Sequence, residues 1–131
     1  MQELSRLVRE GYGQDSIARI AKTEIENSGS RISIIDGVRR LEDIGPFLEL
    51  PNFFLIYVDA DVRMRYERIV QRAENSGDAE KSYEAFLEEE QGETEVSIQS
   101  LRTVASFHLK NETTEADFMG EIDQIIEEIL V

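Results

Sequence analysis

The fold is decided by the segment Phe53–Asp59, which reads FFLIYVD and carries the strongest strand signal in the chain. Aromatic, aliphatic and β-branched side chains follow one another without a polar break until Asp59. Such strands are typical of parallel sheets, in which helices cover both faces. Asp61 is a good N-cap residue, so we expect a helix over Val62–Ala73 soon after this strand.

Shorter apolar runs on either side predict two more strands, at Ile32–Ile35 and at Val104–Leu109. Apolar residues at helical spacing predict helices at residues 4–11, 16–26, 82–91 and 114–130, with a weaker segment at 96–101. A further short helix is expected at 41–50, interrupted near Gly45-Pro46. Because strands alternate with helices, we expect an α/β fold with three layers around a parallel sheet. A chain of 131 residues fits one domain.

The composition is strongly acidic, with 28 Asp and Glu residues against 14 Lys and Arg and a net charge of −14. This charge argues against a general binder of nucleic acid or of membrane surfaces, because both partners are anionic. The chain has no cysteine and one histidine, which excludes disulfides, thiolate metal sites and histidine clusters. It shows neither an apolar signal region nor an apolar run of membrane-spanning length, so we expect a cytoplasmic protein.

The stretch Ser33–Arg40, SIIDGVRR, places polar chemistry at the end of a predicted strand, where ligands gather in open α/β sheets. Asp36 could hold a hydrated magnesium ion, and Gly37 would let a ligand approach the backbone. Arg39 and Arg40 offer planar forks that suit phosphate oxygens. The alternative is a capping aspartate, a turn glycine and two surface arginines, and residue types alone favour it.

A second candidate is the arginine stripe of the helix predicted after Asp61. Arg65, Arg68 and Arg72 have the spacing that puts side chains on one helix face, where they could surround phosphoryl groups. The alternative is a solvated face, with Arg63, Arg68 and Glu67 paired to the acidic helix that follows.

Two further features favour structural roles. The acidic segment at residues 84–95 (EAFLEEEQGETE) predicts an exposed helix, because its spacing matches no metal-ligand motif. His108 stands in an apolar run, so we expect a packed core or edge histidine rather than a catalytic one.

Taken in order, IIDGVRRLED, FFLIYVDADVRMRYERIVQR and the KN before the last helix resemble the P-loop nucleotide kinases. The nearest likeness is to the adenylate-kinase-like and dephospho-CoA-kinase-like group, whose acceptor-covering helices the opening ELSRLVREGYGQDSIARI also resembles. The resemblance implies acceptor-covering helices at residues 1–30, core strands at 31–59, lid-like helices at 60–95 and a final strand and helix at 96–131.

The resemblance also implies roles for individual residues. Asp36 would belong to the network of magnesium and phosphate, and Gly37 to the acceptor site. Either Arg39 or Arg40 would bind the acceptor phosphate, with help from Arg9. On the other side of the site, Arg68 and Arg72 would correspond to the lid arginines that close over the triphosphate of ATP.

One family motif, the phosphate cradle G-x-x-x-x-G-K-[ST], is absent from the sequence. We therefore expect a kinase-like fold that lacks the first strand and the P-loop helix, with little kinase activity from this chain alone. The sheet would be completed by an upstream segment, by direct pairing of its remaining strands or by a second copy of the chain. The alternative from another class is a non-catalytic binding or assembly module built on a degenerate kinase fold.

Overall fold

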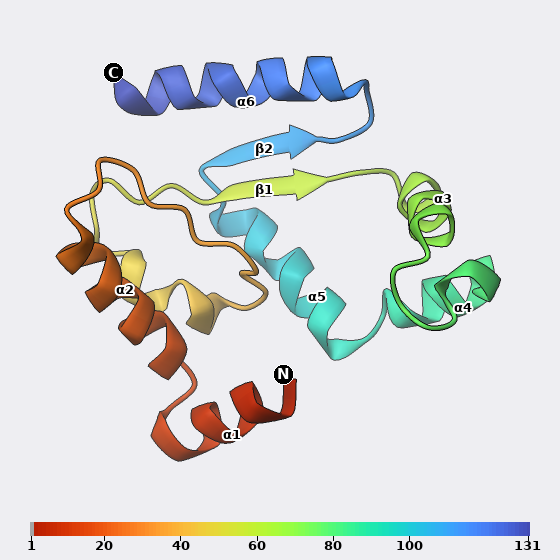
Figure 1. Ribbon diagram of the computed structural model, residues 1–131, viewed down its shortest axis with the longest axis horizontal. Coiled ribbons are helices and arrows are strands. Elements are labelled where there is room, and N and C mark those ends of the chain that lie inside the picture. Colours follow the sequence, from red (N-terminus) through yellow and green to blue (C-terminus); the bar gives the residue numbers. More distant parts are fainter. Residues whose placement is uncertain (1) are drawn as a thin grey trace. The chain divides into compact units, whose positions relative to one another are not determined.

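The computed structural model describes residues 2–131, which fall into two compact units. The first contains the residues up to Phe53 together with Ser97–Leu101, and the second contains Phe54–Val96 and Arg102–Val131. Figure 1 follows the chain from α1 (Gln2–Tyr12) to α6 (Glu115–Leu130). Within the described residues, no helix is both long and apolar enough to cross a lipid bilayer.

The first unit is built from helices that the sequence predicted. After α1, the helix α2 (Ser16–Ser28) ends at Gly29, whose φ of 65° is the left-handed conformation that favours glycine. The short, interrupted helix expected over residues 41–50 is two 3-10 turns, η1 (Leu41–Asp43) and η2 (Gly45–Phe47). The break falls at Ile44, directly before Gly45-Pro46, because proline has no N–H to continue a helix and glycine is a poor helix former.

The core of the first unit centres on Ile44 and Phe47, whose side chains are 0% and 2% exposed. The ring of Phe47 stacks on that of Phe53 with the centroids 5.6 Å apart. Ala18 of α2 is also buried, and α2 contacts η2. Since few other side chains of this unit are buried, Phe47 contributes a large share of its apolar contact area.

The prediction of a strand at Ile32–Ile35 is wrong. Residues 32–39 belong to neither a helix nor a strand, and the side chain of Ile34 is 89% exposed. A strand requires a neighbour that pairs with its backbone N–H and C=O groups, and apolar composition does not supply one. The two strands found within residues 2–131 pair with each other instead. The segment that carries Asp36 is therefore a loop.

The second unit contains a two-stranded parallel sheet of β1 (Ile56–Asp59) and β2 (Phe107–Lys110), with Val58 opposite Leu109. This confirms the prediction of an α/β fold with a parallel sheet. Both strands start later than predicted, because the regular ladder begins only after Leu55. Its carbonyl accepts two backbone N–H groups from the chain entering β2, at 2.8 and 3.1 Å.

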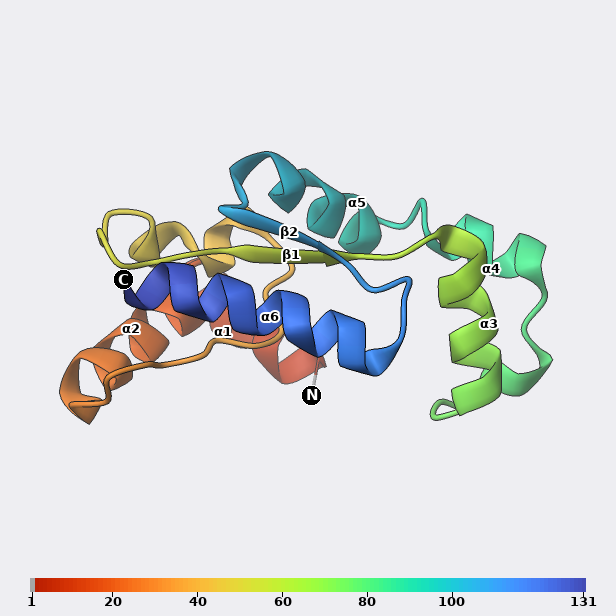
Figure 2. The same ribbon diagram turned by 90° about the horizontal axis from the view of Figure 1, so that it is seen from above.

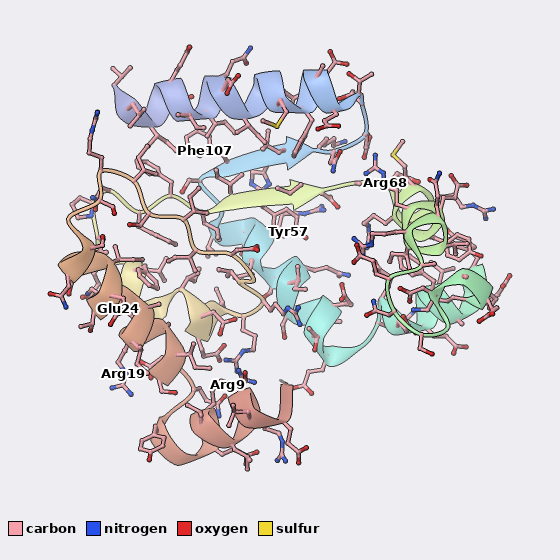
Figure 3. All side chains as sticks on the ribbon, viewed as in Figure 1. Arg9, Arg19, Glu24, Tyr57, Arg68 and Phe107 are labelled. Atoms are coloured by element: carbon pink, nitrogen blue, oxygen red, sulfur yellow. The ribbon has the colours of Figure 1, made fainter. Side chains whose placement is uncertain are left out.

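The helix α6 lies along β2 and covers one face of the sheet (Figures 1 and 2). Leu109 on β2 and Ile125 on α6 are buried, and Phe107 lies between the same two elements (Figure 3). Val58 is on the same face of the sheet but belongs to β1, and it remains 52% exposed. The helix therefore protects the face of β2 better than that of β1.

Three helices of the second unit begin at side-chain N-caps, of which Asp61 was predicted from the sequence. In each, a side-chain oxygen accepts a hydrogen bond from a backbone N–H of the first turn. The pairs are Asp61 with Arg63 (2.9 Å), Ser82 with Ala85 (3.1 Å) and Thr114 with Asp117 (3.2 Å). They begin α3 (Val62–Arg72), α4 (Tyr83–Glu89) and α6. The helix α5 (Glu93–Ser100), whose residues from Ser97 on are assigned to the first unit, starts earlier than the weaker segment predicted at 96–101.

The turn η3 (Asp78–Glu80), between α3 and α4, is held by a buried carboxylate. Asp78 is 4% exposed and accepts hydrogen bonds from the backbone N–H and the side-chain amide of Asn75, at 3.0 and 3.1 Å. Lys81 Nζ lies 3.5 Å from the same carboxylate. These contacts, led by the backbone hydrogen bond from Asn75, lower the pKa of Asp78.

Replacing Asp78 by asparagine is therefore expected to lower the melting temperature at neutral pH. A lowered folded-state pKa stabilises the protein above the unfolded carboxyl pKa of about 4, and this contribution is lost as the pH falls through the folded value. The difference between wild type and Asp78→Asn should shrink in acid. Thermal unfolding followed by circular dichroism at a series of pH values measures it, with Glu80→Gln as the exposed control in the same turn. A difference that stays constant with pH would contradict the role of the carboxylate charge.

Candidate functional site

A cleft of the second unit lies beside α3, which begins shortly after β1 ends. It has a volume of about 360 Å³ and is lined by side chains of α3, α4 and the residues that follow α4. We call it the arginine cleft, and its lining residues are Arg65, Arg68, Ile69, Arg72, Phe86, Glu89, Glu90 and Glu95. Three arginines of one helix thus face the same space, as their spacing predicted.

Arg65 is held at both ends of its guanidinium. Its Nε donates to the carbonyl of Ala60 at 3.0 Å, and its Nη1 lies 2.6 Å from a carboxylate oxygen of Glu90. The Glu90 side chain is only 14% exposed, so this ion pair is better shielded from water than most in the molecule. The hydrogen bond to Glu90 is the main cause that raises the pKa of Arg65. Arg65 therefore remains a cation at any relevant pH.

Arg68 and Arg72 differ in how firmly they are held. Arg68 Nη1 donates to the backbone carbonyl of Asn111 at 2.7 Å, which ties α3 to the residue that follows β2 (Figure 3). Arg72 is 57% exposed, and its Nε lies 3.2 Å from a carboxylate oxygen of Glu74. Arg72 can therefore turn toward a ligand in the cleft more easily than Arg68.

The alternative for this stripe predicted ion pairs from Arg63 and Arg68 to the acidic helix, and neither arginine forms one. Arg63 Nε pairs with Glu67 within α3 at 3.2 Å, and the Arg63 guanidinium lies over the ring of Tyr83, 4.6 Å from its centroid. Arg68 binds a backbone carbonyl rather than the acidic helix. The arginine that forms an ion pair with the acidic segment is Arg65, and its partner is Glu90 at the end of α4.

Sequence reasoning missed a second charged pair at the end of β1. Asp59 forms a close ion pair with Arg102, and its other carboxylate oxygen accepts the backbone N–H of Ala60 at 2.9 Å. The Arg102 guanidinium lies 5.3 Å from the ring centroid of Tyr57, which is labelled on the side of β1 away from α6 (Figure 3). The signal for Asp59 was present, because it ends the strongest strand. Nothing in the sequence around Arg102 pointed to its partner.

The loop at Asp36 belongs to the first unit. The Asp36 carboxylate accepts the backbone N–H of Gly37 at 2.7 Å, and Gly37 has a φ of 79°, a conformation that favours glycine. Among the described residues, the Arg39 guanidinium has no hydrogen-bond or ion-pair partner. The Arg40 guanidinium binds Gln14 Oε1 at 3.0 Å and Asp43 at 2.9 Å. Of the two arginines, Arg39 is thus the one free to bind an anion.

Arg9 lies on α1 and is half-buried, and nothing within residues 2–131 binds its guanidinium. His108 lies on β2 with an exposed side chain, and its ring centroid is 6.0 Å from that of Tyr57. Within residues 2–131, β2 pairs with β1 alone, so this is an edge position, one of the two structural places expected for His108. The predicted site residues therefore fall in both units, with Arg68 and Arg72 in the second.

The part of the chain that the structure describes contains no group of three or more His, Cys, Asp or Glu side chains arranged to hold a metal. Asp36 would thus contribute a single protein ligand to a magnesium ion. Magnesium in nucleotide sites is commonly held by one or two carboxylates together with substrate phosphates and water, so one carboxylate is compatible with such a site.

No family model matches this sequence. The chain is similar to UPF0200 proteins. The protein of that name from Sulfurisphaera tokodaii is 28% identical, and the match covers 99% of this chain and 71% of the relative. UPF0200 protein TK1334 from Thermococcus kodakarensis is 26% identical over 98% of this chain and 71% of its own length. A UPF0200 protein from Hyperthermus butylicus is 28% identical over 96% of this chain and 67% of its own.

These names state no activity. The similarity to the UPF0200 proteins spans both units of the chain, so loop 33–40 and the arginine cleft lie within the matched stretch of the first two relatives.

Proposed function

We propose that this chain is a nucleotide-kinase-like phosphotransferase domain of a cytoplasmic enzyme, which binds phosphate groups in the arginine cleft. The observation that carries the proposal is the convergence of Arg65, Arg68 and Arg72 on one cleft in a chain with a net charge of −14. Guanidinium groups bind phosphate oxygens with charge-assisted and often paired hydrogen bonds. Although glutamates also line the cleft, three guanidinium groups on one helix face can together bind the oxygens of a phosphate ligand.

The proposed reaction is transfer of the γ-phosphoryl group of ATP to a nucleoside monophosphate or a similar acceptor. Such transfer needs little covalent chemistry from the protein, and most of the rate comes from positioning and from neutralising charge. In this scheme Arg68 and Arg72 of the second unit would bind the donor phosphates, and Arg39 of the first unit would bind the acceptor phosphate. Asp36 would orient magnesium, which supplies charge neutralisation at the phosphates when bound.

The triphosphate cradle of the kinases is not among the 131 residues, since the sequence contains no G-x-x-x-x-G-K-[ST] motif. We therefore propose that the domain binds phosphate ligands but does not transfer phosphoryl groups without that element. The three-layer kinase-like fold and a second copy that completes the sheet remain part of the proposal. The partial exposure of Val58 on β1 supports such completion, because an added strand and its cover would bury it.

Replacing Arg72 by glutamine tests this function. We expect the variant to bind MgATP and inorganic pyrophosphate roughly ten-fold more weakly, because one charge-assisted hydrogen bond to phosphate is lost. Isothermal titration calorimetry measures the affinity, with Arg63→Gln as the matched control. Arg63 lies on the same helix but does not line the cleft.

The same protein samples should bind ligand without forming ADP when a nucleoside monophosphate is added. Robust phosphorylation by the pure chain would contradict the need for a cradle. Equal weakening by Arg72→Gln and Arg63→Gln would contradict a phosphate site in the arginine cleft, because both variants remove one positive charge from α3.

The second candidate is a non-catalytic binding or assembly module. It is favoured because two arginines of the cleft already bind groups of the protein itself. Arg65 and Arg68 already bind Glu90 and the Asn111 carbonyl, so part of the stripe serves the fold. This candidate predicts no heat of binding with any nucleoside mono-, di- or triphosphate. Titration of the wild-type chain with these ligands therefore separates the two functions.

A further inference from the structure

We propose that Glu90 is an internal competitor of phosphate, which occupies the arginine cleft and couples ligand binding there to release of the end of α4. The inference rests on the proposed function, because it requires that the cleft binds phosphate. It goes beyond that function by assigning a regulatory contact to a carboxylate of the acidic segment at residues 84–95.

The charges that line the arginine cleft balance. Three arginines are matched by three glutamates, so the cleft does not offer the positive charge that its arginine stripe suggests. Glu89 is directed to another cation, since its carboxylate lies 2.8 Å from Lys81 Nζ and is 60% exposed. Glu90 is the carboxylate of the three that binds an arginine of the cleft.

The contact of Glu90 resembles the one that a ligand would make. A carboxylate oxygen and a phosphate oxygen are equivalent acceptors for a guanidinium N–H. The hydrogen bond from Arg65 Nε to the Ala60 carbonyl fixes the guanidinium, so Nη1 is held near the cleft. The Glu90 carboxylate lies 2.6 Å from Nη1 and occupies the direction in which this N–H points, so a second acceptor cannot bind there. A phosphate that reaches this N–H must displace Glu90 or be repelled by it.

Because Glu90 lies at the C-terminal end of α4, its displacement from Arg65 changes the contacts that hold this end of the helix. Glu90 is the C-cap of α4, and the turn that follows is tight, with the Gly92 N–H donating to the Glu89 carbonyl at 2.8 Å. A side chain at Gly92 would come within 2.9 Å of that carbonyl. The body of α4 is anchored separately, because the buried Phe86 packs on Tyr66 with the ring centroids 5.7 Å apart. Release of Glu90 therefore loosens the last turn of α4 while the rest of the helix stays attached to α3.

Replacing Glu90 by glutamine is expected to tighten the binding of inorganic pyrophosphate by roughly five-fold or more, in the range of typical coupling between sites. Titration calorimetry of the full 131-residue chain measures the change. Glu88→Gln is the matched control, because Glu88 is exposed on the same helix, does not line the cleft and has no ion-pair partner within residues 2–131. It removes the same charge, so it reports the long-range electrostatic effect alone.

A second measurement uses the wild-type chain and needs no variant. Saturating pyrophosphate should speed amide hydrogen exchange in the last turn of α4 and leave the exchange around Phe86 unchanged. If wild type binds pyrophosphate but Glu90→Gln and Glu88→Gln affect it equally, the competition by Glu90 is refuted and the phosphate site stands. If neither wild type nor Glu90→Gln binds pyrophosphate, both the competition and the proposed function are refuted.

Discussion

Replacing Phe47 by alanine is expected to lower the free energy of unfolding by about 3–5 kcal/mol, the usual cost of removing a buried phenylalanine ring. Phe47 is 2% exposed and stacks on Phe53, and it belongs to the small core of the first unit around Ile44. A small core has few neighbouring side chains that can move in to fill the cavity, which favours the upper part of this range. Urea denaturation followed by far-ultraviolet circular dichroism measures the change.

Leu48→Ala is the matched control for this prediction. Leu48 follows Phe47 directly but is 53% exposed, so we expect a change of about 0.5 kcal/mol or less. If the two variants lose similar stability, the assigned core of the first unit is wrong.

Replacing Phe86 by alanine is expected to cost the second unit a similar amount, about 3–5 kcal/mol. Phe86 is 3% exposed, packs on Tyr66 and lies beneath the Arg65 guanidinium, which is 5.9 Å from its ring centroid. Its ring also forms part of the wall of the arginine cleft. We therefore expect weaker pyrophosphate binding along with the lower stability, measured by calorimetry below the unfolding transition.

Leu87→Ala provides the comparison, because Leu87 is the next residue of α4, is 36% exposed and does not line the cleft. It should leave pyrophosphate affinity unchanged. A Phe86→Ala protein that retains full stability would show that α4 is not held to α3 by this ring.

The sequence was most informative where a local interaction determines the structure. Asp61 predicted the start of α3, because an N-cap needs only the first turn of its own helix. The predicted strand at Ile32–Ile35 failed for the opposite reason, since pairing depends on another part of the chain. Apolar composition marked residues able to form a strand but did not determine whether a partner was present.

The candidate site divides along the same line. The spacing of Arg65, Arg68 and Arg72 placed them on one face of a helix, and they line one cleft. Their partners could not be predicted, because Arg65 and Glu90 are 25 residues apart in sequence and meet only after α4 has packed on α3. Identical residue types without these contacts would have suggested a strongly cationic pocket, whereas the folded cleft is neutral.

The pairing of β1 with β2 has a consequence for the order of folding. The ladder joins residues 51 positions apart, as in the hydrogen bond from Leu55 to Ser106, whereas α1 and α2 are joined by a short turn. Closing a loop of that length costs about 3.5 kcal/mol of chain entropy before any strand contact forms. Two short paired strands are only marginally stable, so their first contacts do not offset this cost. We therefore expect the β1–β2 sheet to form after the transition state for folding. Docking of α6 on β2 would then stabilise the paired strands.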